Sequence, residues 1–224
     1  MKNNIDVLKR TQMFAGVADT EIESMLSCLG AREVKYKKGE YVLRQGEKTD
    51  SIAIVTEGVL HIQNDDYWGS RSILGQIEVG EMFGEAYAMA RDDTLLNDVV
   101  AVEDSVVMFF NVKRIITTCP SSCSFHALVT QNLFFAISEK NRKLVQKLSH
   151  MAKRSTREKL ISYLSEEAKR QSSSNLTIPF NRQQLADFLS VDRSAMSNEL
   201  CKMRDEGLLS FIKNNFVLFN LNNA

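Results

Sequence analysis

The chain has 224 residues, of which 44% are hydrophobic and 25% charged, and 28 Lys and Arg residues balance 28 Asp and Glu residues. This length suits one large or two medium domains, and the composition supplies enough apolar material for a core. No apolar run approaches the ~18 residues that indicate a membrane span. The N-terminal segment MKNNIDVLKR lacks the apolar centre of a signal peptide. We therefore expect a soluble cytoplasmic protein with no membrane partner.

The first half of the chain predicts a short helix followed by a β-rich region. The helix is expected around Asp19 to Leu29. From Arg32 to about Phe110, glycines punctuate short segments rich in β-branched and aromatic residues, which is typical of strands. The clearest of these segments are 51–55, 59–63, 98–102 and 105–110. Several short strands at this spacing indicate a sandwich or jelly-roll barrel.

A long helix is predicted after Pro120. About thirty residues follow without Gly or Pro, and their apolar positions repeat near the 3.6-residue period: Phe125, Leu128, Val129, Leu133, Ala136, Ile137, Leu144 and Leu148. Such a helix is about 45 Å long, which exceeds what a small barrel covers. We expect the same helix of a second subunit to cover the remainder across a two-fold axis. The alternative is a core helix lying along its own barrel.

A helix over Thr156 to Lys169 and the linker SSSN (172–175) lead to the segment RQQLADFLSVDRSAMSNELCKM at 182–203. Its first part predicts a helix over 182–189, with Leu185, Ala186 and Leu189 on a buried stripe. The small side chain of Ala186 suits a close crossing of two helices. Asp192 can cap a second helix by accepting hydrogen bonds from amides two or three residues on.

The second helix has a buried face and a polar face. Val191, Met196, Leu200 and Met203 are expected to face inward. The outward residues are of the types that contact phosphates and base edges. The candidate DNA-binding residues of the whole segment are Arg182, Asp192, Arg193, Ser194, Ser197, Asn198 and Lys202.

A β-hairpin is predicted directly after this helix pair. Gly207 precedes two apolar segments, 208–212 and 216–221, joined by Lys213, Asn214 and Asn215. A helix-turn-helix followed by a hairpin is a winged helix. From His150 onward the chain carries 11 Lys and Arg against 8 Asp and Glu. This positive surplus has the sign that a double-stranded DNA partner requires.

The order of these elements resembles the cyclic-AMP receptor protein and fumarate-nitrate regulator (CRP/FNR) family of bacterial transcription regulators. The segment KKGEYVLRQGEKTDSIAIVTEGVLHI (37–62) is similar to the first half of the family's cyclic-nucleotide-binding barrel, and GEMFGE (80–85) is similar to its PGxxFGE loop. The resemblance implies an α+β fold with three parts: an effector-sensing barrel (1–120), a dimerisation helix (121–151) and a winged helix-turn-helix (152–224). It also implies a homodimer that binds a palindromic operator and contacts RNA polymerase.

The chain departs from the cyclic-AMP binders of this family at the phosphate site. Those proteins carry an Arg-Ser pair about eleven residues after the Gly-Glu pair, where this sequence has Leu95 and Leu96. A phosphate buried there would lack a counter-charge. We therefore expect an effector other than cyclic AMP, unless Arg91 substitutes through a rearranged loop. The candidate effector-binding residues are Phe83, Gly84, Glu85, Leu95, Leu96, Leu144 and Val145, with Trp68, Tyr87 and Met89 as further lining. A small organic ligand and a filled core remain equal alternatives.

Other chemistries receive little support. The region before Arg32 offers Cys28 alone, so an iron-sulfur cluster lacks ligands. Cys119 and Cys123 suit ordinary helical cysteines better than a thiol switch, and His61, His126 and His150 form no haem motif. We find no catalytic arrangement and no metal or cofactor motif, so we do not expect an enzyme. The remaining alternative is a ligand-binding regulatory subunit that acts through protein contacts.

Arg193 and Asn198 predict the bases that the second helix reads. Arginine suits guanine and asparagine suits adenine, because each side chain makes a bidentate contact with its base. We expect a palindrome with some A·T content and half-sites about 34 Å apart.

Overall fold

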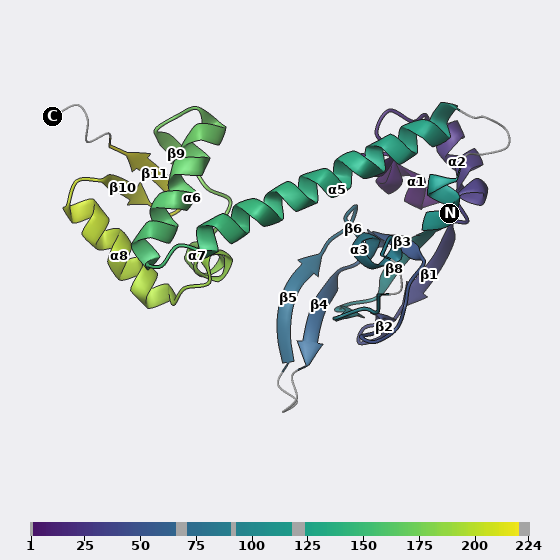
Figure 1. The fold of residues 1–224 in the computed structure, drawn as a ribbon, viewed down its shortest axis with the longest axis horizontal. Coiled ribbons are helices and arrows are strands. Elements are labelled where there is room, and N and C mark those ends of the chain that lie inside the picture. The colour runs from purple at the N-terminus through teal and green to yellow at the C-terminus, as the bar shows by residue number, and fades with distance from the viewer. Residues whose placement is uncertain (1, 66–70, 91–92, 118–123, 220–224) are drawn as a thin grey trace. The chain divides into compact units, whose positions relative to one another are not determined.

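The computed structural model describes residues 2–65, 71–90, 93–117 and 124–219 (Figure 1). The chain divides into two compact units, Met1–Ser138 and Glu139–Ala224. One long helix, α5 (Ser124–Met151), runs through the boundary between them. The predictions on Trp68, Arg91, Cys119 and Cys123 lie outside the described residues.

The first unit begins with three short helical segments, α1 (Lys2–Leu8), η1 (Gln12–Phe14) and α2 (Asp19–Cys28). The sequence predicted α2 and missed the two segments before it. All three bury apolar side chains against the barrel, and the rings of Phe14 and Phe110 lie 5.6 Å apart between centroids. Val129 and Leu133 of α5 belong to the same cluster. The first half of the long helix therefore packs on its own barrel, and this packing is compatible with either interpretation of the helix.

The barrel consists of two four-stranded sheets, ordered β1-β8-β3-β6 and β2-β7-β4-β5. Every described strand pair in them is antiparallel. The strands are β1 (Arg32–Tyr36), β2 (Tyr41–Leu43), β3 (Ser51–Glu57), β4 (Leu60–Asp65), β5 (Arg71–Ile77), β6 (Met82–Phe83), β7 (Asp98–Ala101) and β8 (Ser105–Asn111), with short helices α3 (Glu85–Ala88) and α4 (Val112–Ile116). The four segments predicted as strands are β3, β4, β7 and β8, and the predicted fold class is confirmed.

The turn between β3 and β4 depends on a glycine. Gly58 has a φ of +82°, in the left-handed region that side chains disfavour. A Cβ atom there would lie 2.7 Å from the Asp104 carbonyl oxygen and 2.9 Å from the Ser105 Cα. The backbone of the β7–β8 turn therefore approaches too closely for any other residue.

The second unit contains the end of α5, then α6 (Thr156–Gln171), β9 (Asn175–Thr177), α7 (Arg182–Leu189), α8 (Arg193–Asp205), β10 (Leu209–Ile212) and β11 (Asn215–Leu218). The three strands form one sheet in the order β10-β11-β9. Two expectations are corrected. Asn175 begins β9 instead of ending a linker, because it pairs with Val217. Asn215 is a residue of β11, so the hairpin turn is Lys213–Asn214.

One apolar cluster holds the second unit together. Side chains from α6, α7, α8 and the small sheet meet in it, and the most buried members are Leu160, Ile178, Leu185, Ala186, Leu189, Met196 and Leu200. Burial of a side chain of this size stabilises a fold by about 1.5–3 kcal/mol. The cluster fixes α7 and α8 against each other, and all of its members belong to the second unit.

Candidate nucleic-acid interface and effector region

The turn between α7 and α8 is set by two capping residues. Ser190 ends α7 in the left-handed conformation, with a φ of +50°, and the Val191 amide donates to the Ala186 carbonyl at 3.0 Å. Asp192 then begins α8, because its carboxylate accepts a hydrogen bond from the Ala195 amide at 2.7 Å. The sequence predicted this cap, and the structure confirms it.

A lysine that the sequence reasoning missed also holds the turn. Lys159 Nζ of α6 donates to the carbonyl oxygens of Leu189 and Ser190 at 3.1 and 3.2 Å. These oxygens lie at the C-terminal end of α7, where the helix dipole favours a positive charge. No local pattern could have found this contact, because Lys159 is thirty residues away along the chain.

The polar face of α8 is exposed. Met196, Leu200 and Met203 are buried as predicted, whereas Arg193, Ser194, Asn198 and Lys202 are exposed. Within the described ranges, Arg193, Asn198 and Lys202 make no side-chain hydrogen bond or ion pair with the protein. Ser197 is half-buried, and its hydroxyl donates to the Arg193 carbonyl at 2.9 Å. The helix therefore presents one guanidinium, one amide and one ammonium group that are free to bind.

Arg182 is placed differently from the other candidate DNA-binding residues. It is half-buried, and its guanidinium carbon lies 4.7 Å from the ring centroid of Phe211 and 5.0 Å from that of Phe216. Burial lowers the pKa of this guanidinium from its usual value. The placement favours a packing role between α7 and the hairpin. A DNA contact by Arg182 stays a prediction.

The wing is a short hairpin closed by Lys213 and Asn214. Lys213 adopts a left-handed φ of +54° and is exposed at the tip. The Asn214 side-chain amide donates to the Ile178 carbonyl at 3.0 Å, which ties the turn to the segment after β9. An exposed lysine on a braced turn suits contact with a phosphate backbone.

The first three candidate effector residues lie together at the β6–α3 junction. Phe83 is buried in the barrel core, and Gly84 has a φ of +81°. A Cβ at position 84 would lie 3.3 Å from the Ser51 carbonyl oxygen, so the glycine allows α3 to begin close to β3. Glu85 is the first residue of that short helix.

Leu95 and Leu96, which replace the expected Arg-Ser pair, are oriented differently from each other. The Leu95 side chain is buried, at 3% exposed, whereas that of Leu96 is 64% exposed. The Leu95 backbone is fixed by two hydrogen bonds of 2.8 Å with Gly46 and Glu47. Neither residue can supply a positive charge at this position.

The last two candidate effector residues belong to the other unit. Leu144 and Val145 lie on α5 beyond the unit boundary at Glu139 and are 55% and 56% exposed. Leu148 is similarly exposed at 54%. These three side chains form an apolar stretch of α5 that is more than half exposed among the residues that the structure describes.

Two negative findings apply to the described residues. No group of three His, Cys, Asp or Glu side chains in them is arranged to hold a metal ion. Among the same residues, no helix combines the length and the apolar character needed to cross a membrane.

Comparison with known proteins identifies the two units. A cyclic nucleotide-binding domain model matches residues 33–122, and a Crp-like helix-turn-helix domain model matches residues 158–222. Human cGMP-dependent protein kinase 2 is 26% identical over 101 residues, which cover 44% of this chain and 13% of the kinase. The match thus spans a small part of that relative's length.

Solved structures share the fold of most of the chain. The catabolite activator protein of Thermus thermophilus is 20% identical, with 93% of this chain and 94% of that chain covered and a TM-score of 0.53. The c-di-GMP-responsive regulator CLP of Xanthomonas campestris is 20% identical, with 89% and 98% covered and a TM-score of 0.53. CprK complexed with OCPA is 16% identical, with 90% and 94% covered and a TM-score of 0.54.

Proposed function

The chain belongs to the CRP/FNR family of transcription regulators, and we propose from this premise that it binds a two-fold symmetric DNA site as a homodimer under the control of an effector. The observation that carries the proposal is the polar face of α8. The exposed and unpaired groups of Arg193, Asn198 and Lys202 stand on a helix whose other face is buried. Their chemistry suits a guanine, an adenine and a phosphate.

We assign the parts of the chain as the sequence suggested. Residues 1–120 form the effector-sensing barrel, 121–151 the dimerisation helix and 152–224 the DNA-binding domain. A regulator of this kind works in the cytoplasm beside its operators, needs no catalytic site and contacts RNA polymerase when it activates. The match of 158–222 to a Crp-like helix-turn-helix disfavours a subunit that acts through protein contacts alone.

The α5 helix supplies the proposed dimer contact. Phe134, Leu144, Val145 and Leu148 are each more than half exposed. Phe134 and Leu148 are fourteen residues apart, with Asn141 midway, which is the heptad spacing of a two-helix seam. A buried Asn at one such position fixes the register of the pair.

The effector is proposed to be something other than cyclic AMP. Leu95 is buried and carries no charge, so a cyclic phosphate at this position would lose its hydration without gaining a counter-charge. The candidate effector contacts remain Phe83, Gly84, Glu85, Leu95 and Leu96 in the first unit and Leu144 and Val145 in the second.

The experiment is selection of fragments from the source genome by the purified full chain at moderate salt, followed by sequencing. We expect enrichment of a palindrome whose halves lie about 34 Å apart. If no site is enriched, either with the purified chain or after addition of cell extract as a source of effector, the proposal is wrong.

Arg193→Ala tests the role of α8 on the selected site. Loss of one bidentate guanine contact should weaken specific binding by about 1–3 kcal/mol and relax one base position. Arg10→Ala, an exposed arginine of the first unit, is the matched control and should leave affinity unchanged. Equal loss on specific and random DNA would make Arg193 a phosphate contact instead.

A further inference from the structure

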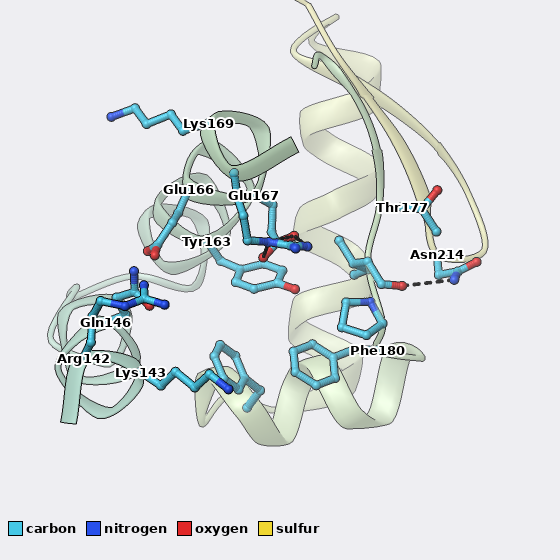
Figure 2. A pocket seen from close by; sticks show the side chains of 14 residues that line it. Arg142, Lys143, Gln146, Tyr163, Glu166, Glu167, Lys169, Thr177, Phe180 and Asn214 are labelled. Atoms are coloured by element: carbon cyan, nitrogen blue, oxygen red, sulfur yellow. Dashed lines mark hydrogen bonds and ion pairs between the residues drawn. The ribbon is translucent and has the colours of Figure 1, made fainter. Parts of the chain in front are cut away.

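An open-sided pocket lies within the second unit, and none of the exposed polar residues of α8 lines it. It has a volume of about 1090 Å³ and is lined by the last part of α5, by α6, by the segment after β9 and by α7 (Figure 2). A volume of this order accommodates a small molecule. All of the lining residues belong to the unit that begins at Glu139.

Three aromatic rings form one side of the pocket. The ring centroids of Phe180 and Phe188 lie 4.9 Å apart, those of Tyr163 and Phe188 5.5 Å apart, and those of Tyr163 and Phe180 6.1 Å apart. Such separations are those of favourable aromatic pairs. The cluster is continuous with the core of the unit, so its shape is fixed by packing and offers a rigid surface to a flat ligand.

The Tyr163 hydroxyl has no hydrogen-bond partner among the described residues. Tyr163 is 4% exposed and lines the pocket, and Figure 2 shows its hydroxyl pointing towards the side that carries Phe180 and Asn214. Burial raises the pKa of this phenol above its usual value. An unpaired buried hydroxyl costs stability, and a ligand atom within reach would recover that cost.

The two arginines that line the pocket are paired with carboxylates, whereas the two lining lysines, Lys143 and Lys169, have no such partner among the described residues. Arg142 is paired with Glu139 at 2.8 Å and Arg170 with Glu167 at 2.6 Å. His150 Nε2 lies 2.9 Å from the Glu166 carboxylate.

Lys143 makes no hydrogen bond or ion pair with any residue that the structure describes. Figure 2 shows its side chain extending along the pocket. The nearby Glu139 carboxylate is already bonded to Arg142, so the Lys143 ammonium group favours a further anion.

We propose that this pocket binds a small planar aromatic anion, with the ring of the ligand on the Phe180–Phe188 surface, a hydrogen bond to the Tyr163 hydroxyl, and the anionic group neutralised by Lys143. None of the candidate effector residues lines this pocket, although Leu144 and Val145 lie between the lining residues Lys143 and Gln146 along α5. The proposal concerns ligand binding alone, so its test does not depend on whether the protein binds DNA.

The test uses 2-naphthoate as the probe and isothermal titration calorimetry of the full-length chain. We expect saturable binding at one site per chain. Tyr163→Phe should weaken it by about tenfold, the amount expected for one hydrogen bond to a charged partner. Tyr41→Phe, the same chemical change in β2 of the other unit, is the matched control and should leave the affinity unchanged.

A second variant tests whether the Lys143 charge contributes to binding of the anionic probe. Lys143 is exposed, so Lys143→Gln should leave the melting temperature unchanged. It should weaken 2-naphthoate binding but not the weaker binding of the neutral 2-naphthamide. The proposal is overturned if the wild-type chain does not bind 2-naphthoate. It is equally overturned if the chain binds the probe with an affinity that neither Tyr163→Phe nor Lys143→Gln reduces, because the probe then occupies another site.

Discussion

Arg182 packs within the DNA-binding domain, whereas Arg193 is exposed on its surface. The guanidinium of Arg182 lies against Phe211 and Phe216 of the hairpin, and this residue is half-buried. Removing the side chain deletes these cation–π contacts and the packing of its stem. We predict that Arg182→Ala lowers the free energy of unfolding by about 1–2 kcal/mol, measured by urea titration of the full chain.

Arg193→Ala is the control for this prediction, because Arg193 is exposed and unpaired within the described residues. It should leave the free energy of unfolding unchanged and weaken specific DNA binding. The reverse pattern, with Arg182→Ala as stable as the wild type but unable to bind its site, would establish Arg182 as a DNA contact and contradict the packing role.

The sequence alone does not distinguish these two arginines. Both directly follow a capping residue, Asn181 before α7 and Asp192 before α8, and both were expected to face DNA. Their difference comes from the hairpin, whose aromatic side chains arrive from more than twenty-five residues further along the chain. The polarity of a side chain can thus be read from the sequence, whereas its burial depends on the tertiary fold.

At the scale of elements, α8 depends on the Asp192 cap. The carboxylate accepts the Ala195 amide at 2.7 Å, so Asp192→Ala should lower the free energy of unfolding by about 1 kcal/mol. Asp192→Asn keeps an acceptor at the cap and should cost much less. The Asn variant also removes a negative charge beside Arg193, so it should bind DNA at least as tightly as the wild type. Urea titration and fluorescence anisotropy on the selected site measure the two effects.

An Asn variant that keeps its stability but loses specific binding would show that the Asp192 carboxylate itself contacts a base, as the sequence interpretation allowed. Asparagine keeps an oxygen that can accept from the Ala195 amide. An Asn variant as unstable as the Ala variant would therefore show that this hydrogen bond is not what stabilises α8. The two measurements therefore separate a capping role from a base-reading role.

Elements were predictable where their signals are local. The helix bounds at Arg182–Leu189 and Arg193 follow from capping residues and a 3.6-residue apolar repeat within one short window. In contrast, β9 has three residues and exists because Thr177 pairs with Asn215, far along the chain. The long helix was recognised from its apolar repeat, but the repeat does not say which turns pack on the barrel and which remain exposed.

At the scale of the whole molecule, the apolar stretch on α5 is exposed among the described residues, and we proposed above that a second α5 helix covers it. Leu148 is 54% exposed, and a glutamate there would place two like charges at the seam of two α5 helices. We predict that Leu148→Glu makes the chain monomeric in sedimentation velocity. It should also remove high-affinity binding to the palindrome, because a monomer holds a single half-site and loses the gain from simultaneous engagement.

The matched control is Leu74→Glu on β5, where the leucine is 56% exposed and lies on the barrel. This variant should stay dimeric and bind the palindrome as the wild type does. If Leu74→Glu dissociates the dimer and Leu148→Glu does not, the barrel strands form the interface and the α5 seam is wrong. If Leu148→Glu remains dimeric yet fails to bind the palindrome, the exposed stretch of α5 acts in orienting the DNA-binding domains instead of in holding the two subunits together.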